Sequence, residues 1–196
     1  GRMDNKSRQA KYVKMLSGCG MTLELGCGDG DFLRLCGAAG IRAEGVDKNP
    51  GALSRGLNVK KADIVAFMRK RKRNSLGNVY ARHVAEHLTP KRLKMLLSAS
   101  WRALRSKGRI ILVFPNTDNA YVMAHEFWKD VTHVRPYPVS VIEKMLKDEG
   151  FVIILSGPDN DSWDNCFIKM LARRIRSCLM GLKWQAPDCF VVAEKK

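Results

Sequence analysis

The chain has 196 residues, 45% of them hydrophobic, and its 35 basic and 19 acidic residues give a net charge of +16. This length favours a single domain, residues 1–196, with a sizeable core. The sequence has no apolar run of about 18 residues, the length that a membrane-spanning helix needs. The six cysteines form no C-x-x-C pair, which argues against a zinc ribbon, so we expect free thiols in a cytoplasmic protein without a leader peptide.

Apolar runs and turn residues predict a regular alternation of strands and helices. The first element is a basic amphipathic helix at 4–18, which forms most of an N-terminal segment 1–18. Strands are predicted at 21–25, 41–46, 58–61, 79–82, 109–114, 151–155 and 189–193. Helices are predicted at 31–39, 64–73, 90–105, 139–149 and 166–182, with a turn at 106–108 and a loop at 157–165.

Strands that alternate with helices predict a mostly parallel α/β sheet of seven strands, with helices on both faces. The last two strands are joined by an insertion, 158–188, instead of a simple crossover. This insertion carries a basic amphipathic helix. We therefore expect the final strand to run antiparallel to its neighbours.

A glycine-rich turn follows the first predicted strand. The sequence Thr22-Leu-Glu-Leu-Gly-Cys-Gly-Asp-Gly30 passes from an apolar run into Gly26, Gly28 and Gly30, and helical sequence begins after it. Glycines let the backbone come close to a ligand, and the helix N-terminus offers amide donors. Asp47 ends the second strand, where a carboxylate suits the two hydroxyls of a ribose. The pattern indicates a nucleoside ligand, although a glycine turn in an ordinary strand–helix unit remains the plain alternative.

From about residue 20 onward the chain resembles class I S-adenosylmethionine-dependent methyltransferases, especially members associated with polysaccharide and glycolipid biosynthesis. The resemblance rests on segments in the family's order: Leu23–Gly30, Asp47, Ala62-Asp63-Ile64, Asn78–Leu88 and Lys107–Asn116. It implies a Rossmann-like, doubly wound fold and S-adenosyl-L-methionine as cofactor. The alternative, an NAD(P)-dependent reductase, usually shows G-x-G-x-x-G, whereas position 31 here is Asp.

The resemblance also implies the residues that bind the cofactor, which are Glu24, Gly26, Cys27, Gly28, Gly30, Asp47, Lys48, Asp63, Ile64 and His83. Asp63 corresponds to the residue that contacts the adenine amino group in the family. Asn78 departs from the pattern, because the fourth-strand segment commonly begins with Asp. The chain has no Asn/Asp-Pro-Pro-Tyr run and no Pro-Cys nucleophile after strand four, which disfavours methylation of exocyclic base amines and of cytosine C5.

The four histidines, His83, His87, His125 and His133, all follow the predicted fourth and fifth strands, where an acceptor would lie in this fold. His83-x-x-Glu86-His87 resembles the Glu-x-x-Glu-His metal site of some O-methyltransferases, with His in place of the first Glu. That replacement makes a Mg²⁺ site less natural, since Mg²⁺ prefers oxygen ligands. Helix capping, a histidine base and a metal site stay open, and we assign no metal.

A second polar cluster lies at 128–137, after the fifth strand. Asp130-x-Thr132-His133-x-Arg135-Pro136-Tyr137 looks like a string found in methyltransferases of polysaccharide or glycolipid biosynthesis. We predict Asp130 and His133 as a base and the group that orients it, with His83 as a further catalytic residue. Arg135 would bind a phosphate or carboxylate bidentately. Tyr137, His87 and His125 complete the predicted acceptor side.

The predicted activity is O-methylation of a glycan, a phosphoglycan or a small anionic acceptor. The basic charge, to which the run 69–73 contributes, attracts polyanions such as RNA. An RNA methyltransferase is therefore the alternative enzyme. The helix at 166–183 is basic and amphipathic and has tryptophans on either side, which fits contact with an anionic membrane surface. A cofactor-binding adaptor without turnover at a membrane is the alternative of another class.

Overall fold

The computed structural model describes residues 9–18, 20–51, 56–159 and 185–196. Within this part of the chain the strands form one seven-stranded sheet in the order β3-β2-β1-β4-β5-β7-β6. The strands are β1 (Thr22–Leu25), β2 (Ala43–Asp47), β3 (Val59–Lys61), β4 (Leu76–Arg82), β5 (Leu104–Pro115), β6 (Phe151–Pro158) and β7 (Asp188–Lys195). The α-helices with defined bounds are α2 (Asp31–Ala38), α3 (Ile64–Lys70), α4 (Pro90–Ala103) and α5 (Val139–Asp148).

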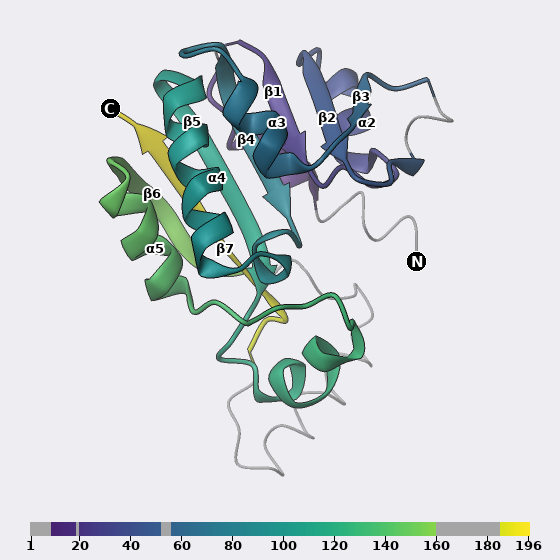
Figure 1. Ribbon diagram of the computed structural model, residues 1–196, viewed down its shortest axis with the longest axis vertical. Coiled ribbons are helices and arrows are strands. Elements are labelled where there is room, and N and C mark those ends of the chain that lie inside the picture. The colour runs from purple at the N-terminus through teal and green to yellow at the C-terminus, as the bar shows by residue number, and fades with distance from the viewer. Residues whose placement is uncertain (1–8, 19, 52–55, 160–184) are drawn as a thin grey trace.

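The predicted mixed sheet is confirmed. Strands β1 to β5 pair in parallel, whereas β7 pairs antiparallel with both β5 and β6 and lies between them. Since successive parallel strands all end at the same edge, the loops after β1, β2, β4 and β5 meet there. In Figure 1 the segment that carries the short helices η3 (Val122–Glu126) and η4 (Phe127–Lys129) lies beyond this edge.

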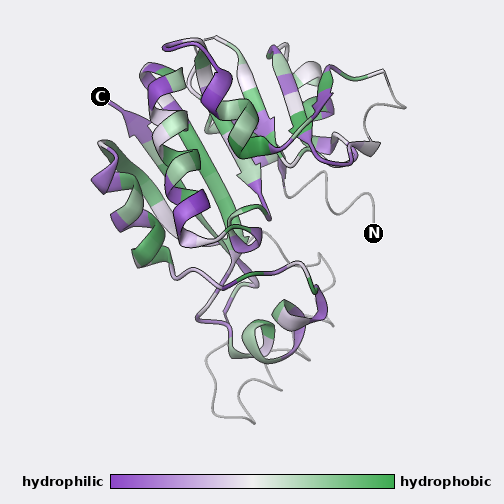
Figure 2. Cartoon of the chain, viewed as in Figure 1, coloured by the Kyte–Doolittle hydropathy of each residue, from purple (hydrophilic) through white to green (hydrophobic). Residues whose placement is uncertain are grey.

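Alternating side chains on the central strands build two apolar layers, one on each face of the sheet. Ile110 and Leu112 of β5 join the layer under α3, α4 and α5, whereas Ile111 and Val113 face α2 and the helical residues 9–14. Figure 2 shows apolar strands covered by helices whose outer surfaces are hydrophilic. Buried on both faces, the sheet forms a rigid platform for the loops at its edge.

Several element boundaries differ from the prediction. Of the helix expected at 4–18, residues 9–14 are helical and 15–18 are not, while 4–8 lie outside the described residues. The turn expected at 106–108 lies inside β5, where a bulge between the Leu76–Leu104 and Asn78–Arg109 pairs absorbs the extra residues and Lys107 takes a φ of 60°. Strand β6 continues to Pro158, into the expected loop, because β7 pairs with it along that length.

The predicted basic helix at 166–182 falls outside the described residues. Helices η3 and η4 were not expected from the sequence. None of the helices in the described part of the chain combines the length and the apolar character that crossing a bilayer would take.

Candidate active site

The glycine loop after β1 is fastened to the neighbouring strand by its own backbone. The amides of Gly26 and Cys27 donate to the carbonyl of Val46 at 2.8 and 3.3 Å, and the amide of Gly28 donates to Oδ2 of Asp47 at 2.9 Å. Gly26, Gly28 and Gly30 all have positive φ values, of 70°, 46° and 76°. A side chain would strain each of these positions, so the turn needs glycine.

The space around the loop differs from one glycine to the next. A Cβ at Gly26 would meet Cγ2 of Val84 at 2.7 Å, so this glycine packs against the segment that follows β4. A Cβ at Gly28 would meet nothing within 4 Å. Gly28 therefore leaves room for a ligand to approach the backbone, whereas Gly26 does not.

Glu24 of β1 lies under this loop with a buried carboxylate. Its side chain is 5% exposed, and its Oε2 has no hydrogen-bond partner among the described residues. Burial, together with the charges of Asp31 and Asp47, raises the pKa of Glu24 well above its usual value. A cationic ligand group at the loop would supply the missing partner.

The two predicted aspartates already hold parts of the backbone in place. Asp47, at the end of β2, accepts hydrogen bonds from the amides of Gly28 and Asn49. Asp63 caps α3 through the amides of Val65 and Ala66.

The second oxygen of Asp63 pairs with basic side chains. It lies 2.6 Å from Nη2 of Arg92 and 3.8 Å from Nζ of Lys48. Burial alone would raise the pKa of Asp63, but the amide of Ala66 and the guanidinium of Arg92 hold it below its usual value. Ile64, the next predicted residue, begins α3. The ion pair brings the predicted Asp63 and Lys48 together.

The side chain of Cys27 points into the core rather than toward a ligand. It packs with Leu33 and Val59, and a Cβ on Gly45 would lie 2.7 Å from its sulfur. Burial, followed by the charges of Glu24 and Asp47, raises the pKa of the Cys27 thiol to about 12. Cys27 can therefore offer a ligand its backbone but not a thiolate. Cys36 and Cys189 are also buried free cysteines.

His83 lies on the turn after β4 with a φ of 52°, between two carboxylates. Its Nδ1 is 3.0 Å from Oε1 of Glu86, and its Nε2 is 3.6 Å from Oδ2 of Asp188. Partial desolvation lowers the pKa of His83, but Asp188 and Glu86 outweigh it and raise the pKa to about 9. Both ring nitrogens face carboxylates, so the ring has no nitrogen directed at an acceptor. Asp188 was not among the predicted site residues, because no short-range pattern connects it with His83, which is distant in the chain.

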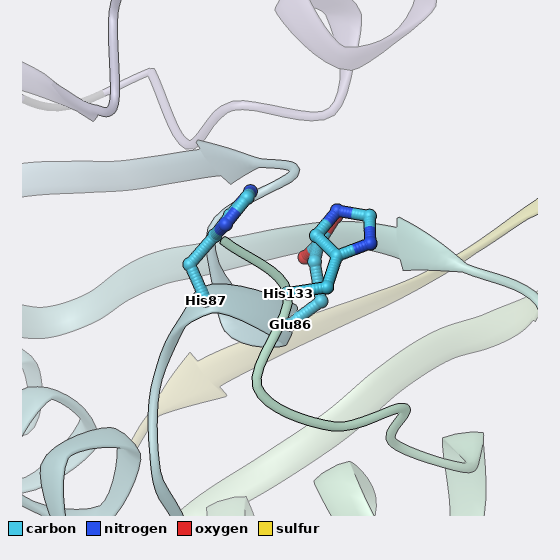
Figure 3. Close-up of side chains that lie close together, drawn as sticks. All are labelled: Glu86, His87 and His133. Carbon is cyan, nitrogen blue, oxygen red and sulfur yellow. The ribbon is translucent and has the colours of Figure 1, made fainter. Parts of the chain in front are cut away.

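The loop after η4 is joined to the short helix η2 (Ala85–His87) by backbone hydrogen bonds. The amides of Val134 and Arg135 donate to the carbonyl of Glu86 at 2.7 and 3.3 Å. This contact brings His133 next to His87, with ring centroids 4.7 Å apart. Figure 3 shows the resulting group, with Glu86 and His87 from η2 and His133 from the loop.

Asp130 does not orient His133 in the predicted way. Its Oδ1 accepts hydrogen bonds from the amide and the hydroxyl of Thr132, and its Oδ2 is 3.9 Å from Nε2 of His133. The His133 ring is held instead by the carbonyl of Phe127, 2.6 Å from Nδ1. Thr132, which sequence reasoning did not single out, also contacts Nδ1 of His87 at 2.9 Å through its hydroxyl.

The remaining predicted acceptor residues occupy different environments. Tyr137 is 2% exposed and donates its hydroxyl to the carbonyl of Leu88, so it supports the loop rather than facing a ligand. Arg135 is exposed, and its guanidinium lies 5.1 Å from the centre of the Tyr137 ring. His125 is exposed beside Tyr121 and does not join the cluster of Glu86, His87 and His133.

Comparisons with known proteins agree with the fold. A family model described as a methyltransferase domain matches residues 9–156, and no curated protein matches the chain. The crystal structure of an S-adenosylmethionine-dependent methyltransferase from Archaeoglobus fulgidus is 26% identical, with a TM-score of 0.83 over 100% of this chain and 95% of that one.

Two other solved structures share the fold at lower identity. Phosphoethanolamine N-methyltransferase 2 from Haemonchus contortus is 16% identical with a TM-score of 0.70, over 96% of this chain and 52% of that one. Geranyl diphosphate C-methyltransferase from Streptomyces coelicolor is 13% identical with a TM-score of 0.70, over 97% of this chain and 78% of that one. The chain belongs to the methyltransferase domain family and is an S-adenosylmethionine-dependent methyltransferase.

Proposed function

We propose that the protein transfers a methyl group to a hydroxyl oxygen of a small acceptor that carries a phosphate or carboxylate, such as a glycan or phosphoglycan. The observation that carries this proposal is the position of Arg135. Its exposed guanidinium pairs with no carboxylate among the described residues, and it is two residues from His133. An arginine in this state suits bidentate binding of an anionic acceptor group.

The fold relatives support a small anionic acceptor. One is a phosphoethanolamine methyltransferase and another a geranyl diphosphate methyltransferase, so both are named for phosphate-bearing small molecules. They transfer methyl groups to nitrogen and to carbon. The preference for oxygen rests on His87 and His133, because a hydroxyl of high pKa needs a group that takes its proton.

For the cofactor we propose the set implied by the sequence. The buried carboxylate of Glu24 would pair with the ammonium group at the amino-acid end of the cofactor, and Asp47 would bind the ribose hydroxyls. The glycine loop from Gly26 to Gly30 would contact the cofactor, with the open backbone of Gly28 nearest to it. The adenine would be bordered by Asp63, Ile64 and Lys48. His83 would lie beside the cofactor, because it follows β4. Bound there, S-adenosylmethionine supplies an activated methyl group.

The protein's own contribution is then mainly positioning. Arg135 fixes the anionic end of the acceptor, and the loop that carries it is anchored to η2 by the carbonyl of Glu86. Good alignment of two reactants can lower a barrier by about 7–11 kcal/mol. In this proposal His87 and His133 would lie beside the acceptor hydroxyl, whose proton has to leave.

The test is a methylation screen with labelled cofactor against hydroxylated phosphates, sugar acids, neutral sugars, amines and RNA. We expect label on an anionic hydroxyl compound, and Arg135→Ala should raise its KM about 10–100-fold, the value of a charged hydrogen bond. Arg42→Ala is the matched control, because Arg42 is exposed and precedes β2 at the opposite end of the strand from Asp47. Label on RNA alone, with steep salt dependence, would overturn the proposal in favour of an RNA methyltransferase.

A further inference from the structure

We propose that Glu86, His87 and His133 form a binding site for one divalent transition-metal ion of the Zn²⁺ type. Each of the three residues offers a ligand atom, and these atoms lie within 4.8 Å of one another. The side chains come from two separate segments, η2 and the loop after η4, as Figure 3 shows. The proposed group differs from the one that sequence spacing suggested, since His133 takes the place of His83.

Every ligand residue is held by a hydrogen bond that leaves another atom available. Nδ1 of His87 contacts the carbonyl and the hydroxyl of Thr132, and Nδ1 of His133 contacts the carbonyl of Phe127. A ring that donates Nδ1–H to a carbonyl keeps its lone pair on Nε2, which is the usual arrangement of metal-binding histidines. Both rings are therefore fixed in the tautomer that can ligate a metal through Nε2.

Glu86 provides an independent observation. Its side chain is 1% exposed, and its Oε1 contacts His83, whereas its Oε2 has no hydrogen-bond partner among the described residues. An unsatisfied buried carboxylate oxygen is costly, and such oxygens are rare without an ion or a water beside them. A bound cation would satisfy this oxygen, and His83 would hold the carboxylate in position as a hydrogen-bonding partner behind it.

The donor set selects the kind of metal. Two imidazole nitrogens and one carboxylate oxygen suit Zn²⁺, Co²⁺ or Fe²⁺, whereas Mg²⁺ and Ca²⁺ prefer sites made of oxygen. Zinc binds nitrogen and oxygen at about 2.0–2.2 Å, so the three atoms would close inward around the ion. Three protein ligands also leave a coordination position open, as in catalytic zinc sites.

The role of the ion rests on the proposed function, and with the ion bound His87 and His133 would act through the metal rather than as free bases. Glu86 and His87 follow β4, and the loop that carries His133 meets them there, so an ion held by these residues would lower the pKa of a hydroxyl bound to it. The proton would pass to solvent, and the oxygen lone pair would form the new bond to the methyl carbon as the bond from that carbon to sulfur breaks. Arg135, on the same loop, would hold the anionic group of that acceptor.

The site is tested without cofactor or acceptor. Purified full-length protein, stripped with a chelator, is titrated with Co²⁺ and followed by its visible absorption, and Zn²⁺ is then added as competitor. We expect one Co²⁺ per chain with the bands of a nitrogen- and oxygen-ligated ion, displaced by Zn²⁺. His87→Ala and His133→Ala should each weaken binding at least tenfold, and Glu86→Gln should do so with little change in side-chain shape.

His125→Ala is the matched control, because His125 lies on the neighbouring segment outside the cluster and should leave the Co²⁺ affinity unchanged. Stoichiometric binding that survives both histidine variants would overturn the site, as would sulfur-to-cobalt charge-transfer bands, which mark binding by cysteines. Circular dichroism of each variant separates loss of ligands from loss of folding.

The two proposals can fail separately. If the protein binds Co²⁺ as expected but methylates no hydroxyl compound, the O-methyltransferase proposal falls and the metal site stands. If a hydroxyl acceptor is methylated at the same rate before and after treatment with the chelator, the role of the ion falls and the proposed function stands.

Discussion

Two buried glutamates, Glu24 and Glu86, are the residues that most clearly indicate ligand sites in this molecule. Glu24 and Glu86 each keep one carboxylate oxygen without a hydrogen-bond partner in the described part of the chain. Both lie at the carboxyl edge of the sheet, one in β1 and the other in η2 after β4. Buried polar atoms of this kind weaken a fold unless a ligand satisfies them. Each of these two oxygens therefore lowers the stability of the unliganded fold, and we propose that a cofactor satisfies the first and a metal ion the second.

The pH dependence of cofactor binding tests the role of Glu24. Because burial raises the pKa of Glu24, the free carboxyl keeps its proton to a higher pH than usual, whereas the cationic cofactor favours the carboxylate. Binding should release a proton, and affinity should rise with pH until the pKa of the free carboxyl is passed. Calorimetry in two buffers of different ionisation enthalpy measures the released proton.

Glu24→Gln is the matched variant for that measurement. It should weaken binding about 10–100-fold, the value of a charged hydrogen bond, and abolish the proton release. An unchanged affinity together with an unchanged release would show that the proton comes from another group and that Glu24 does not contact the cofactor.

At the scale of elements, the loop between β1 and α2 contains two glycines with different tasks. Gly28→Ala adds a methyl group where nothing lies within 4 Å, at a φ of 46°. Its cost in stability should be limited to backbone strain of about 1–2 kcal/mol, while cofactor affinity should fall at least tenfold because the methyl group occupies the approach to the loop. Urea unfolding and calorimetry measure the two effects.

Gly26→Ala is the comparison for this loop. The same backbone strain is joined by a clash with Val84, so its loss of stability should exceed that of Gly28→Ala. Equal loss of stability, with cofactor affinity intact in Gly28→Ala, would mean that the ligand approaches the chain elsewhere.

Most elements could be predicted from the sequence because their signals are local. Apolar runs and the glycines that separate them mark strands β1, β2 and β5, and Pro90 marks the start of α4. The extension of β6 to Pro158 could not be predicted, because it depends on pairing with β7. The prediction of a turn at 106–108 is wrong for a related reason, because pairing with β4 on either side keeps these residues within β5 as a bulge.

At the scale of the whole molecule, the chain topology decides which parts of the site could be predicted from the sequence. The residues that we propose for the cofactor lie within one strand–loop–helix unit and at the ends of neighbouring strands, so their grouping follows from the fold pattern. The grouping of His133 with Glu86 depends on how a loop folds back onto η2 through backbone hydrogen bonds. No local spacing encodes that contact, and spacing instead favoured His83, which the structure turns toward Asp188.

The N-terminal helical residues 9–14 are part of the domain rather than an appendage. Tyr12 is buried against the rings of Tyr80 and Phe190, at centroid distances of 5.7 and 5.8 Å. Its hydroxyl donates to Oδ2 of Asp159 at 2.5 Å, which links the start of the chain to the residue after β6. These contacts complete the apolar layer on the α2 face of the sheet, so stability of the whole domain should depend on them.

Replacing Tyr12 measures that dependence in two steps. Tyr12→Phe keeps the ring and removes the hydrogen bond to the buried carboxylate of Asp159, which should lower the free energy of unfolding by about 1–3 kcal/mol. Tyr12→Ala also empties the ring's place and should cost about 3–5 kcal/mol. Lys14→Ala, an exposed position on the same segment, is the control and should stay within about 0.5 kcal/mol. Urea unfolding followed by fluorescence and by circular dichroism gives these values. Should Tyr12→Ala unfold at the same urea concentration as the unmodified chain, the N-terminal segment contributes nothing to the fold and the second apolar layer closes without it.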